Sequence, residues 1–330
     1  MVLKRALGNG SWEAVGLGCM NVSWAYAAPP PPAEAARLLN LALDLGYRHF
    51  DTSRLYGGGS NEELLGDALC HRRDELFLAS KMGLFAEGGK RWVDCRPETI
   101  KAECDRSLKA LRTDRIDLYY MHRRDFAVPI EDSAGAMADL VRAGKIAGYG
   151  LSEMSAETLR KAHAVHPVTA VQTEYSLWTR NPELGVLEAT RELGVALVAF
   201  SPLARGVLAG AVRDPQALEQ RDLRRTHPRF DAENWPRNLA LADAFNAVAA
   251  EEGVAPAQLA LAWVLSRGEH VHVIPGTTNA AHLAENIARS DWRPSAAVLD
   301  RVGRLINHDT VSGPRYPASM QATMDTEEFA

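Results

Sequence analysis

The chain has 330 residues, of which 46% are hydrophobic and 24% are charged, and its formal net charge is -5. This balance argues against a broad nucleic-acid-binding surface, because neutralising phosphates requires an excess of clustered Lys and Arg. No segment approaches the roughly 20 consecutive apolar residues that span a bilayer, and the first residues lack the apolar core of a signal peptide. We therefore expect a cytoplasmic protein with no nucleic-acid or membrane partner.

Short β-like runs alternate with amphipathic helical runs along most of the chain, the pattern that builds a parallel sheet from βαβ units. A hairpin is expected first, at 3–18, with its turn at Asn9-Gly10. The expected strands are 48–51, 76–80, 116–122, 146–151, 168–172, 196–200 and 271–274, with a weak eighth after Glu285. The expected helices are 33–45, 60–69, 97–111, 132–143, 156–164, 182–193, 239–252, 256–267 and 295–306.

This number of βα units favours a closed (β/α)8 TIM barrel over an open doubly wound sheet. No G-x-G-x-x-G follows any expected strand, so a Rossmann dinucleotide site is not supported. The polar stretch 213–237 is expected to be a long loop on the barrel rim, and 308–330 an irregular C-terminal tail. The whole chain, 1–330, is therefore expected to form a single barrel domain with an N-terminal β-hairpin and long rim loops.

Metal chemistry has little support in the sequence. The chain has four cysteines, and none of them forms a Cys-x-x-Cys pair or a zinc spacing. The closely spaced histidines His163 with His166 and His270 with His272 have no nearby Cys or acidic ligands in an obvious cluster. We expect no metal site, and we expect structural or incidental thiols.

Ionisable side chains stand where three neighbouring strands are expected to end, which is where reactive groups gather in a parallel barrel. Asp51 ends the first of these strands with Tyr56 a few residues into its loop, Lys81 follows the second, and His122 ends the third. Any one of them alone has an ordinary structural explanation. Four ionisable types at corresponding strand ends form a much more specific signal.

The four residues also form a coherent chemical set. A phenol has a pKa of about 10 in water and donates its proton slowly at neutral pH. An ammonium at Lys81 would lower the pKa of Tyr56, and Asp51 would keep that ammonium charged. We expect Tyr56 to protonate a developing alkoxide, while a neutral His122 donates a hydrogen bond to the carbonyl oxygen and orients the substrate.

The segments that carry these residues resemble those of the aldo-keto reductases, (β/α)8 enzymes that reduce carbonyl groups with NAD(P)H through an Asp, Tyr, Lys and His tetrad. The resemblance runs from the N-terminal hairpin to about Asn286. It implies that Tyr56 is the general acid, that Asp51 and Lys81 tune it, and that His122 positions the carbonyl. The matching segments are His49-Phe50-Asp51-Thr52-Ser53-x-x-Tyr56-Gly57, Ser80-Lys81 and Ile116-Asp117-Leu118-Tyr119-Tyr120-Met121-His122.

The resemblance extends to segments that bind the nicotinamide end of the cofactor. It implies contacts to the carboxamide from Ser152, Glu153 and Gln172, although many members have Asn where this chain has Glu153, and an ionised Glu only accepts hydrogen bonds. Phe200 matches the aromatic residue that stacks on nicotinamide. The loop expected over the pyrophosphate contains Ser201, Pro202, Leu203, Arg205 and Gly206.

The segment after the last expected strand resembles the one that holds the adenosine end, and its residues are Gly276, Thr277, Thr278, His282, Glu285 and Asn286. Small hydroxyl residues at a helix start suit phosphate binding. Many NADPH-specific relatives have Lys and Arg in place of Gly276 and His282, so NADH remains an alternative. We expect NADPH, because the two threonines, Arg205 and a partly protonated His282 could hold a 2′-phosphate.

The substrate is expected to be a small carbonyl compound. Trp24, Phe85 and Trp178, with residues of the 213–237 loop, would form a mostly aromatic pocket for aryl or medium aliphatic carbonyls. Trp24 and Trp178 could equally be ordinary packing on the barrel rim. A different class of function is a redox-sensing interaction module, like the barrel-shaped subunits of some ion channels, that binds the cofactor with little turnover. The sequence leaves the oligomeric state and the physiological substrate open.

Overall fold

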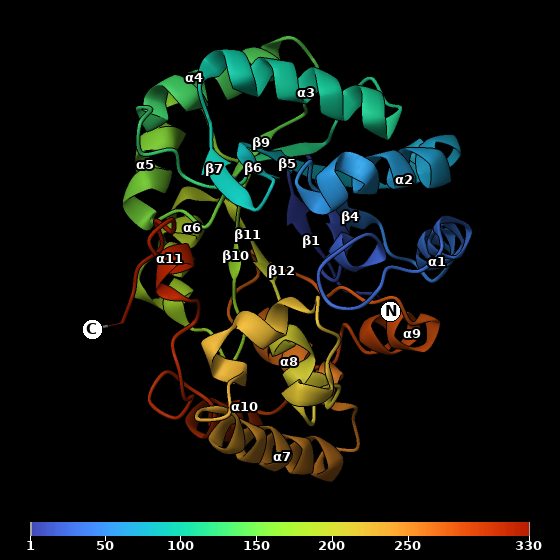
Figure 1. The fold of residues 1–330 in the computed structure, drawn as a ribbon, viewed down its shortest axis with the longest axis vertical. Coiled ribbons are helices and arrows are strands. Elements are labelled where there is room, and N and C mark those ends of the chain that lie inside the picture. The colour runs from blue at the N-terminus through green and yellow to red at the C-terminus, as the bar shows by residue number, and fades with distance from the viewer. Residues whose placement is uncertain (1, 330) are drawn as a thin grey trace.

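The computed structural model describes residues 2–329, in which parallel strands form a barrel surrounded by helices (Figure 1). In barrel order the strands are β3 (Leu17–Gly18), β4 (His49–Asp51), β5 (Phe77–Met82), β8 (Leu118–Met121), β9 (Tyr149–Ser152), β10 (Ala170–Glu174), β11 (Ala196–Phe200) and β12 (Val271–Ile274). An isolated parallel bridge between Val15 and Val273 joins the first strand region to the last. The predicted (β/α)8 TIM barrel is thus confirmed.

The helices that cover the strands are α1 (Pro32–Asp44), α2 (Ser60–Leu69), α3 (Pro97–Leu111), α4 (Ile130–Arg142), α5 (Ala156–Val165), α6 (Val186–Leu193), α7 (Trp235–Glu251), α8 (Pro256–Leu265), α9 (Ala280–Ala288), α10 (Ala296–Leu305) and the short α11 (Ala318–Gln321). Several begin with a proline at the first helical position, where the missing N–H is not needed. Buried side chains on one face of each longer helix pack toward the strands.

The position expected for the eighth strand is wrong. Residues after Glu285 belong to helix α9, and the eighth barrel strand is β3, which precedes the other seven barrel strands in the chain. Two residues give no alternation of apolar and polar side chains, so sequence periodicity has nothing to detect. The backbone identifies the strand instead: Gly18 N–H donates to the Pro275 carbonyl at 3.1 Å, across the seam of the barrel.

The N-terminal hairpin, β1 (Lys4–Leu7) and β2 (Gly10–Glu13), closes one end of the barrel. Its turn is Gly8-Asn9, one residue earlier than expected, because Leu7 pairs with Gly10. Arg5 donates to the carbonyls of Leu265 at 2.8 Å and Gly268 at 2.7 Å, at the base of β12. The cavity described below opens at the opposite end of the barrel, where the strands end.

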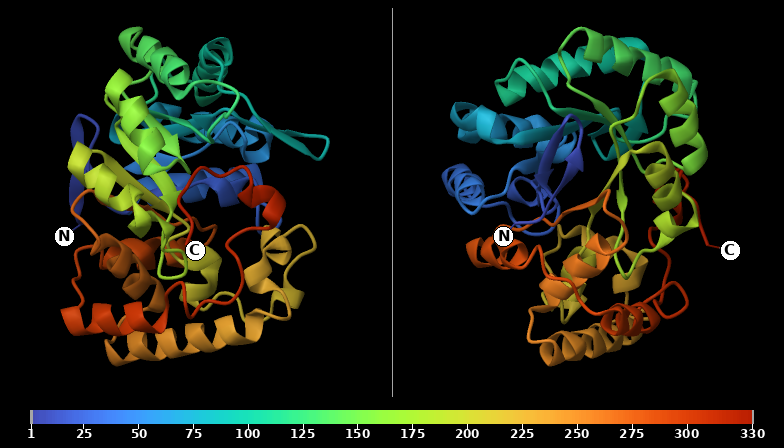
Figure 2. Two further views of the ribbon diagram at one scale, coloured as in Figure 1. Left: turned by 90° about the vertical axis from the view of Figure 1, so that its left-hand side faces the viewer. Right: turned by 180° about the vertical axis from the view of Figure 1, so that it is seen from behind.

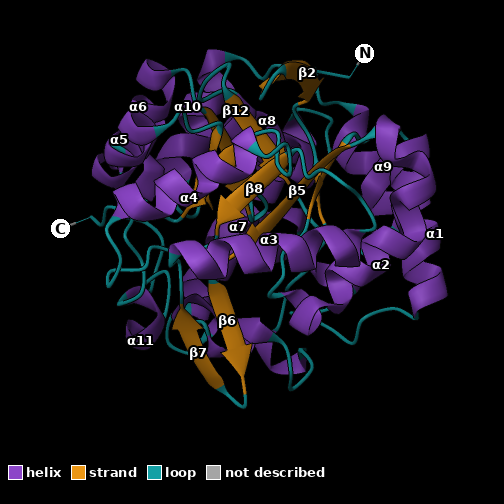
Figure 3. Ribbon diagram, turned by 90° about the horizontal axis from the view of Figure 1, so that it is seen from above, coloured by secondary structure: helices purple, strands orange, loops and turns teal. Residues whose placement is uncertain are grey.

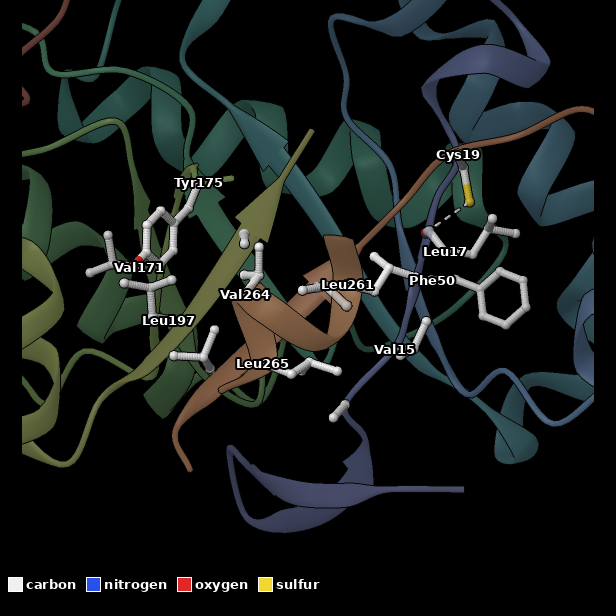
Figure 4. Packing of buried hydrophobic residues seen from close by; sticks show 14 of the residues in the cluster. Val15, Leu17, Cys19, Phe50, Val171, Tyr175, Leu197, Leu261, Val264 and Leu265 are labelled. Atoms are coloured by element: carbon white, nitrogen blue, oxygen red, sulfur yellow. Dashed lines mark hydrogen bonds between the residues drawn. The ribbon is translucent and has the colours of Figure 1, made fainter. Parts of the chain in front are cut away.

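The core lies between the barrel and its helices. In Figure 4, Leu261 and Val264 of α8 lie between Phe50 of β4 and the side chains of β10 and β11, and each of these three is at most 3% exposed. Close packing of this kind fixes the strand positions, and with them the side chains at the strand ends. Cys19, just after β3, is fully buried and directs its thiol to the Leu17 carbonyl.

Two segments rise from the end of the barrel opposite the N-terminal hairpin. A second hairpin, β6 (Leu84–Glu87) with β7 (Lys90–Val93), follows β5, and the C-terminal tail carries α11. Figures 2 and 3 show both on the same side of the molecule. The tail is irregular apart from α11, as expected, but it is anchored: Asp325 accepts a hydrogen bond from Ser155 N–H at 3.0 Å, and Arg315 is 5% exposed.

The free energy of unfolding should fall as the pH falls below about 6.5, because four histidines are buried as neutral imidazoles. They are His49, His122, His227 and His272. Burial lowers the pKa of His49 to about 3 and the pKa of His272 to about 4. The unfolded chain binds protons at about pH 6.5 and the folded chain does not, so each buried histidine adds a slope of up to about 1.4 kcal/mol per pH unit to the free energy of unfolding.

Urea unfolding at pH 7.5 and pH 5.5 measures this slope. His49→Leu, which removes a side chain whose ring nitrogens have no hydrogen-bond partner, should reduce it by about a quarter. Equal stability of the wild-type protein at the two pH values would contradict the assignment of neutral buried imidazoles.

Candidate active site

The four side chains of the predicted tetrad lie together at the open end of the barrel. Lys81 in β5 extends its ammonium to the Asp51 carboxylate, at the end of the neighbouring strand β4, and forms a salt bridge with it. The same nitrogen lies 2.8 Å from the Thr52 carbonyl and 3.3 Å from the Tyr56 hydroxyl. A fully buried ammonium needs such partners, and here three oxygens surround it.

Gln172 completes the support of Asp51. Its Nε2 donates to the second carboxylate oxygen of Asp51 at 2.7 Å. Both oxygens of the carboxylate are therefore engaged, one with Lys81 and the other with an amide from β10, on the opposite side of the barrel. This fixes the direction in which the carboxylate holds the ammonium.

The Tyr56 hydroxyl is held in its protonated form. Burial raises the pKa of Tyr56 above its ordinary value, and the Lys81 ammonium only partly opposes this shift. The net lowering expected from the sequence is therefore wrong, because desolvation of the phenolate outweighs the attraction of the ammonium. For Lys81, burial alone would lower the pKa, but Asp51 and Tyr56 outweigh it and the pKa is raised. The pair thus consists of a neutral phenol beside a cation.

His122 is a neutral imidazole at the same end of the cavity. Burial lowers its pKa well below the usual range, and Arg123 and Lys81 lower it further. Its Nδ1 lies 3.1 Å from Ser53 Oγ. When Nδ1 accepts from that hydroxyl, Nε2 carries the proton and can donate to a substrate oxygen. The His122 ring stands edge-on to the Tyr56 ring, with 6.1 Å between their centroids.

A cavity of about 430 Å³ opens at the ends of the strands and passes Tyr56 and His122. It continues along the loop after β11 to the start of α9. The predicted site residues that line it are Trp24, Asp51, Tyr56, His122, Ser152, Gln172, Phe200, Ser201, Pro202, Leu203, Arg205, Gly206, Gly276, Thr277, Thr278, His282, Glu285 and Asn286.

The predicted aromatic wall needs correction at two positions. Trp178 is 4% exposed and stacks on Phe230, with 6.3 Å between ring centroids, so it belongs to the packing of the rim and not to the cavity lining. Phe85 stacks on Trp92 across the β6–β7 hairpin. Neighbouring positions on a strand face opposite sides, and the hairpin instead contributes Leu84 and Arg91 to the cavity. Trp24 does line the cavity and stacks on Tyr56.

Glu153 also lies outside the cavity lining, contrary to the expected carboxamide contact. Its backbone has a φ of 55°, in the left-handed region, and its carboxylate is fully buried. One oxygen accepts from Arg315 at 2.6 Å and from Glu174 N–H at 2.8 Å. The side chain is thus committed to the C-terminal tail.

Several cavity residues had not been predicted, and they come from the C-terminal tail, the second hairpin and the loop after β8. Tyr316 of the tail lines the cavity and donates its hydroxyl to Glu174 at 2.8 Å. The same carboxylate accepts from Arg205 at 3.0 Å, so this predicted cofactor cation is already in a salt bridge. Arg91 and Arg123 line the cavity beside His122. Only the position of Arg123, directly after the strand-end histidine, could have identified it from the sequence.

The cavity has the groups that a nicotinamide dinucleotide requires. Phe200 offers a half-buried aromatic face, and Ser152 and Gln172 offer polar side chains nearby on the same wall. At the other end, helix α9 begins next to Thr277, whose hydroxyl lies 3.4 Å from His282 Nδ1. Exposed N–H groups and hydroxyls at a helix start suit phosphate. Within residues 2–329 no group of His, Cys, Asp and Glu is arranged to hold a metal ion.

The profile of the aldo/keto reductase family matches residues 14–306. The chain belongs to this family, and it is an oxidoreductase that acts on carbonyl groups with a nicotinamide cofactor. No helix in the described part of the chain is long and apolar enough to cross a membrane.

The sequence similarity to individual relatives extends over nearly the whole chain. It is 40% identical to the NADP(+) aldo-keto reductase yakc of Schizosaccharomyces pombe over 98% of this chain and 97% of that one, and 39% identical to probable aldo-keto reductase 1 of Glycine max over 92% and 88%. Among solved structures, the glycerol dehydrogenase AKR11B4 of Gluconobacter oxydans is similar, with a TM-score of 0.85 and 27% identity. The match covers 96% of this chain and 98% of that one. The aldo-keto reductase AKR11C1 of Bacillus halodurans has a TM-score of 0.75, 26% identity and coverage of 93% and 97%.

Proposed function

We propose that this protein reduces small aldehydes or ketones to alcohols with NADPH, and that Tyr56 donates the proton. The observation that carries the proposal is the Tyr56 hydroxyl, 3.3 Å from the Lys81 ammonium and on the wall of the cavity that continues to Phe200 and α9. Bound NADPH supplies the hydride for the carbonyl carbon. The chain supplies the proton, the orientation of the substrate and the site that excludes water.

Each residue of the tetrad has a separate role in this proposal. His122 Nε2 donates a hydrogen bond to the carbonyl oxygen and orients it toward the Tyr56 hydroxyl. Tyr56 transfers its proton to that oxygen as charge develops there. Lys81 stays charged, so it stabilises the phenolate that remains, and Asp51 keeps Lys81 in place.

NADPH should bind at least about tenfold more tightly than NADH, because a 2′-phosphate would meet Thr277, Thr278 and His282 at the start of α9. The name of the yeast relative, an NADP(+) enzyme, supports the same preference. Fluorescence titration with the two cofactors measures it. His282→Ala should reduce the affinity for NADPH and leave the affinity for NADH near the wild-type value. Equal affinities of the wild-type protein for the two cofactors would contradict the phosphate site.

The alternative, a cofactor-binding interaction module with little turnover, is less well supported, since the full-length relatives carry the names of reductases. Steady consumption of NADPH with a panel of small aldehydes supports the enzyme, and tight cofactor binding without turnover supports the module.

A cytoplasmic location and a single domain over 1–330 stay predictions. Free Cys19, Cys70, Cys95 and Cys104 suit a reducing compartment.

A further inference from the structure

Two arginines beside the tetrad have no carboxylate partner within residues 2–329. Arg91 comes from β7 of the second hairpin, Arg123 directly follows His122, and both line the cavity. Other arginines of the cavity are neutralised: Arg205 pairs with Glu174, and Arg224 with Asp222 at 2.6 Å. Positive charge is therefore left uncompensated at the end of the cavity where the proposed proton donor lies.

The Arg123 guanidinium is only partly satisfied by the protein. The residue is 8% exposed, and its Nη1 donates to the His122 carbonyl at 2.6 Å and to Ser152 Oγ at 3.4 Å. Its Nε and Nη2 donate to no atom of the described chain, and neither atom is fully enclosed. These N–H groups are thus accessible from the cavity. Burying a cation without a counter-ion costs free energy, which a bound anion would offset.

Arg91 faces the same space from the hairpin. Arg91 is an exposed residue, and its side chain forms no hydrogen bond or salt bridge with the described residues. Partial burial of the guanidinium lowers its pKa, and the nearby Arg123 guanidinium lowers it further. Both guanidinium groups also lower the pKa of His122, so both act on the region around this imidazole. Two like charges that converge on one space form an unfavourable arrangement in the absence of an anion.

We propose that Arg91 and Arg123 bind an oxyanion of the substrate, so that the preferred substrates are carbonyl compounds that carry a carboxylate or phosphate away from the reacting carbonyl. The inference rests on the proposed function and names its substrate class. The planar fork of a guanidinium matches a carboxylate or phosphate through paired N–H donors. Trp24, Leu55 and Leu84 line the same cavity and provide apolar surface for the body of such a substrate.

Matched aldehydes test the proposal with NADPH and the full chain. The ratio of kcat/KM for 4-carboxybenzaldehyde to that for its methyl ester should exceed about ten. The ester is intrinsically the more electrophilic aldehyde, so its reactivity alone would give the opposite preference. In Arg91→Gln and in Arg123→Gln the ratio should fall about tenfold. The control Arg142→Gln, which removes an exposed arginine on α4, should leave the ratio unchanged.

A second pair, 4-formylphenyl phosphate and 4-methoxybenzaldehyde, distinguishes the two oxyanions: a larger fall of this ratio in the arginine variants than of the carboxylate ratio identifies phosphate as the favoured group. Binding of 4-carboxybenzyl alcohol in the presence of NADPH, a reduced cofactor with which an alcohol cannot react, is measured by calorimetry and tests the site without turnover. Each arginine variant should bind it about tenfold more weakly. If the alcohol binds in this pattern but the protein does not turn over any aldehyde, the proposed function is refuted and the oxyanion site is not. Wild-type ratios near one in both pairs, or equal binding by wild type and both variants, would overturn the oxyanion site.

Discussion

Tyr56→Phe should lower the rate of carbonyl reduction by about 10²- to 10⁴-fold, the contribution typical of a positioned general acid. The ring should remain in place, because it stacks on Trp24 with 6.3 Å between centroids and lies 5.0 Å below the Lys81 ammonium. Only the donor is lost, so the Kd for NADPH should stay near the wild-type value. Single-turnover oxidation of bound NADPH by benzaldehyde measures the chemical step without product release.

A second tyrosine provides the matched control. Tyr149 is fully buried, and its hydroxyl donates to the carbonyls of Ala162 and His166, remote from the cavity lining. Tyr149→Phe should lose about 1 kcal/mol of stability and retain the single-turnover rate. If Tyr56→Phe also retained that rate, Tyr56 would not be the proton donor.

Arg315→Met should reduce the free energy of unfolding by about 3–5 kcal/mol, the usual cost of removing one partner from a buried ion pair. The Arg315 guanidinium contacts Glu153 at 2.6 Å and Glu174 at 3.1 Å, and both carboxylates are nearly inaccessible to water. Without Arg315, Glu153 loses its salt-bridge partner, and Glu174 keeps its salt bridge with Arg205 and its hydrogen bond from Tyr316. Urea unfolding at pH 7.5 measures the change.

Arg301→Met is the matched control, because Arg301 pairs with Glu251 on the surface and its loss should leave the urea midpoint close to wild type. Adding Glu153→Gln to Arg315→Met should restore part of the lost stability, since it removes the unpaired buried charge. Wild-type stability of Arg315→Met would show that the tail is not held to the barrel by this ion pair.

The buried strands and amphipathic helices were predictable because burial imposes a periodic pattern on their residues. Helices 60–69 and 97–111 were predicted at the bounds that α2 and α3 have in the structure. β3 was not found, since a two-residue strand has no period. The β6–β7 hairpin did have a signal: Gly88-Gly89 between short β-like runs is a typical hairpin turn.

The tetrad was predictable for a different reason: parallel strands end at one edge, so Asp51, Lys81 and His122 had to meet there. Loop geometry has no such rule: Phe85 was wrongly assigned to the aromatic wall, and Trp178 follows the alternative of ordinary packing on the rim. The contact between Glu153 and Arg315 joins residues 162 positions apart through a segment without periodicity. Neither composition nor spacing indicates that pairing.

The pH dependence of single-turnover reduction by the wild-type protein tests the central claim, the identity of the acid, most directly. Tyr56 has a raised pKa and His122 one well below its usual range, so Tyr56 stays protonated and His122 neutral near neutral pH. A general acid loses activity only as the pH rises through its own pKa. The rate should be level from about pH 6.5 to about pH 9. A decline centred near pH 7 would instead identify a histidine as the proton donor and contradict the assignment to Tyr56.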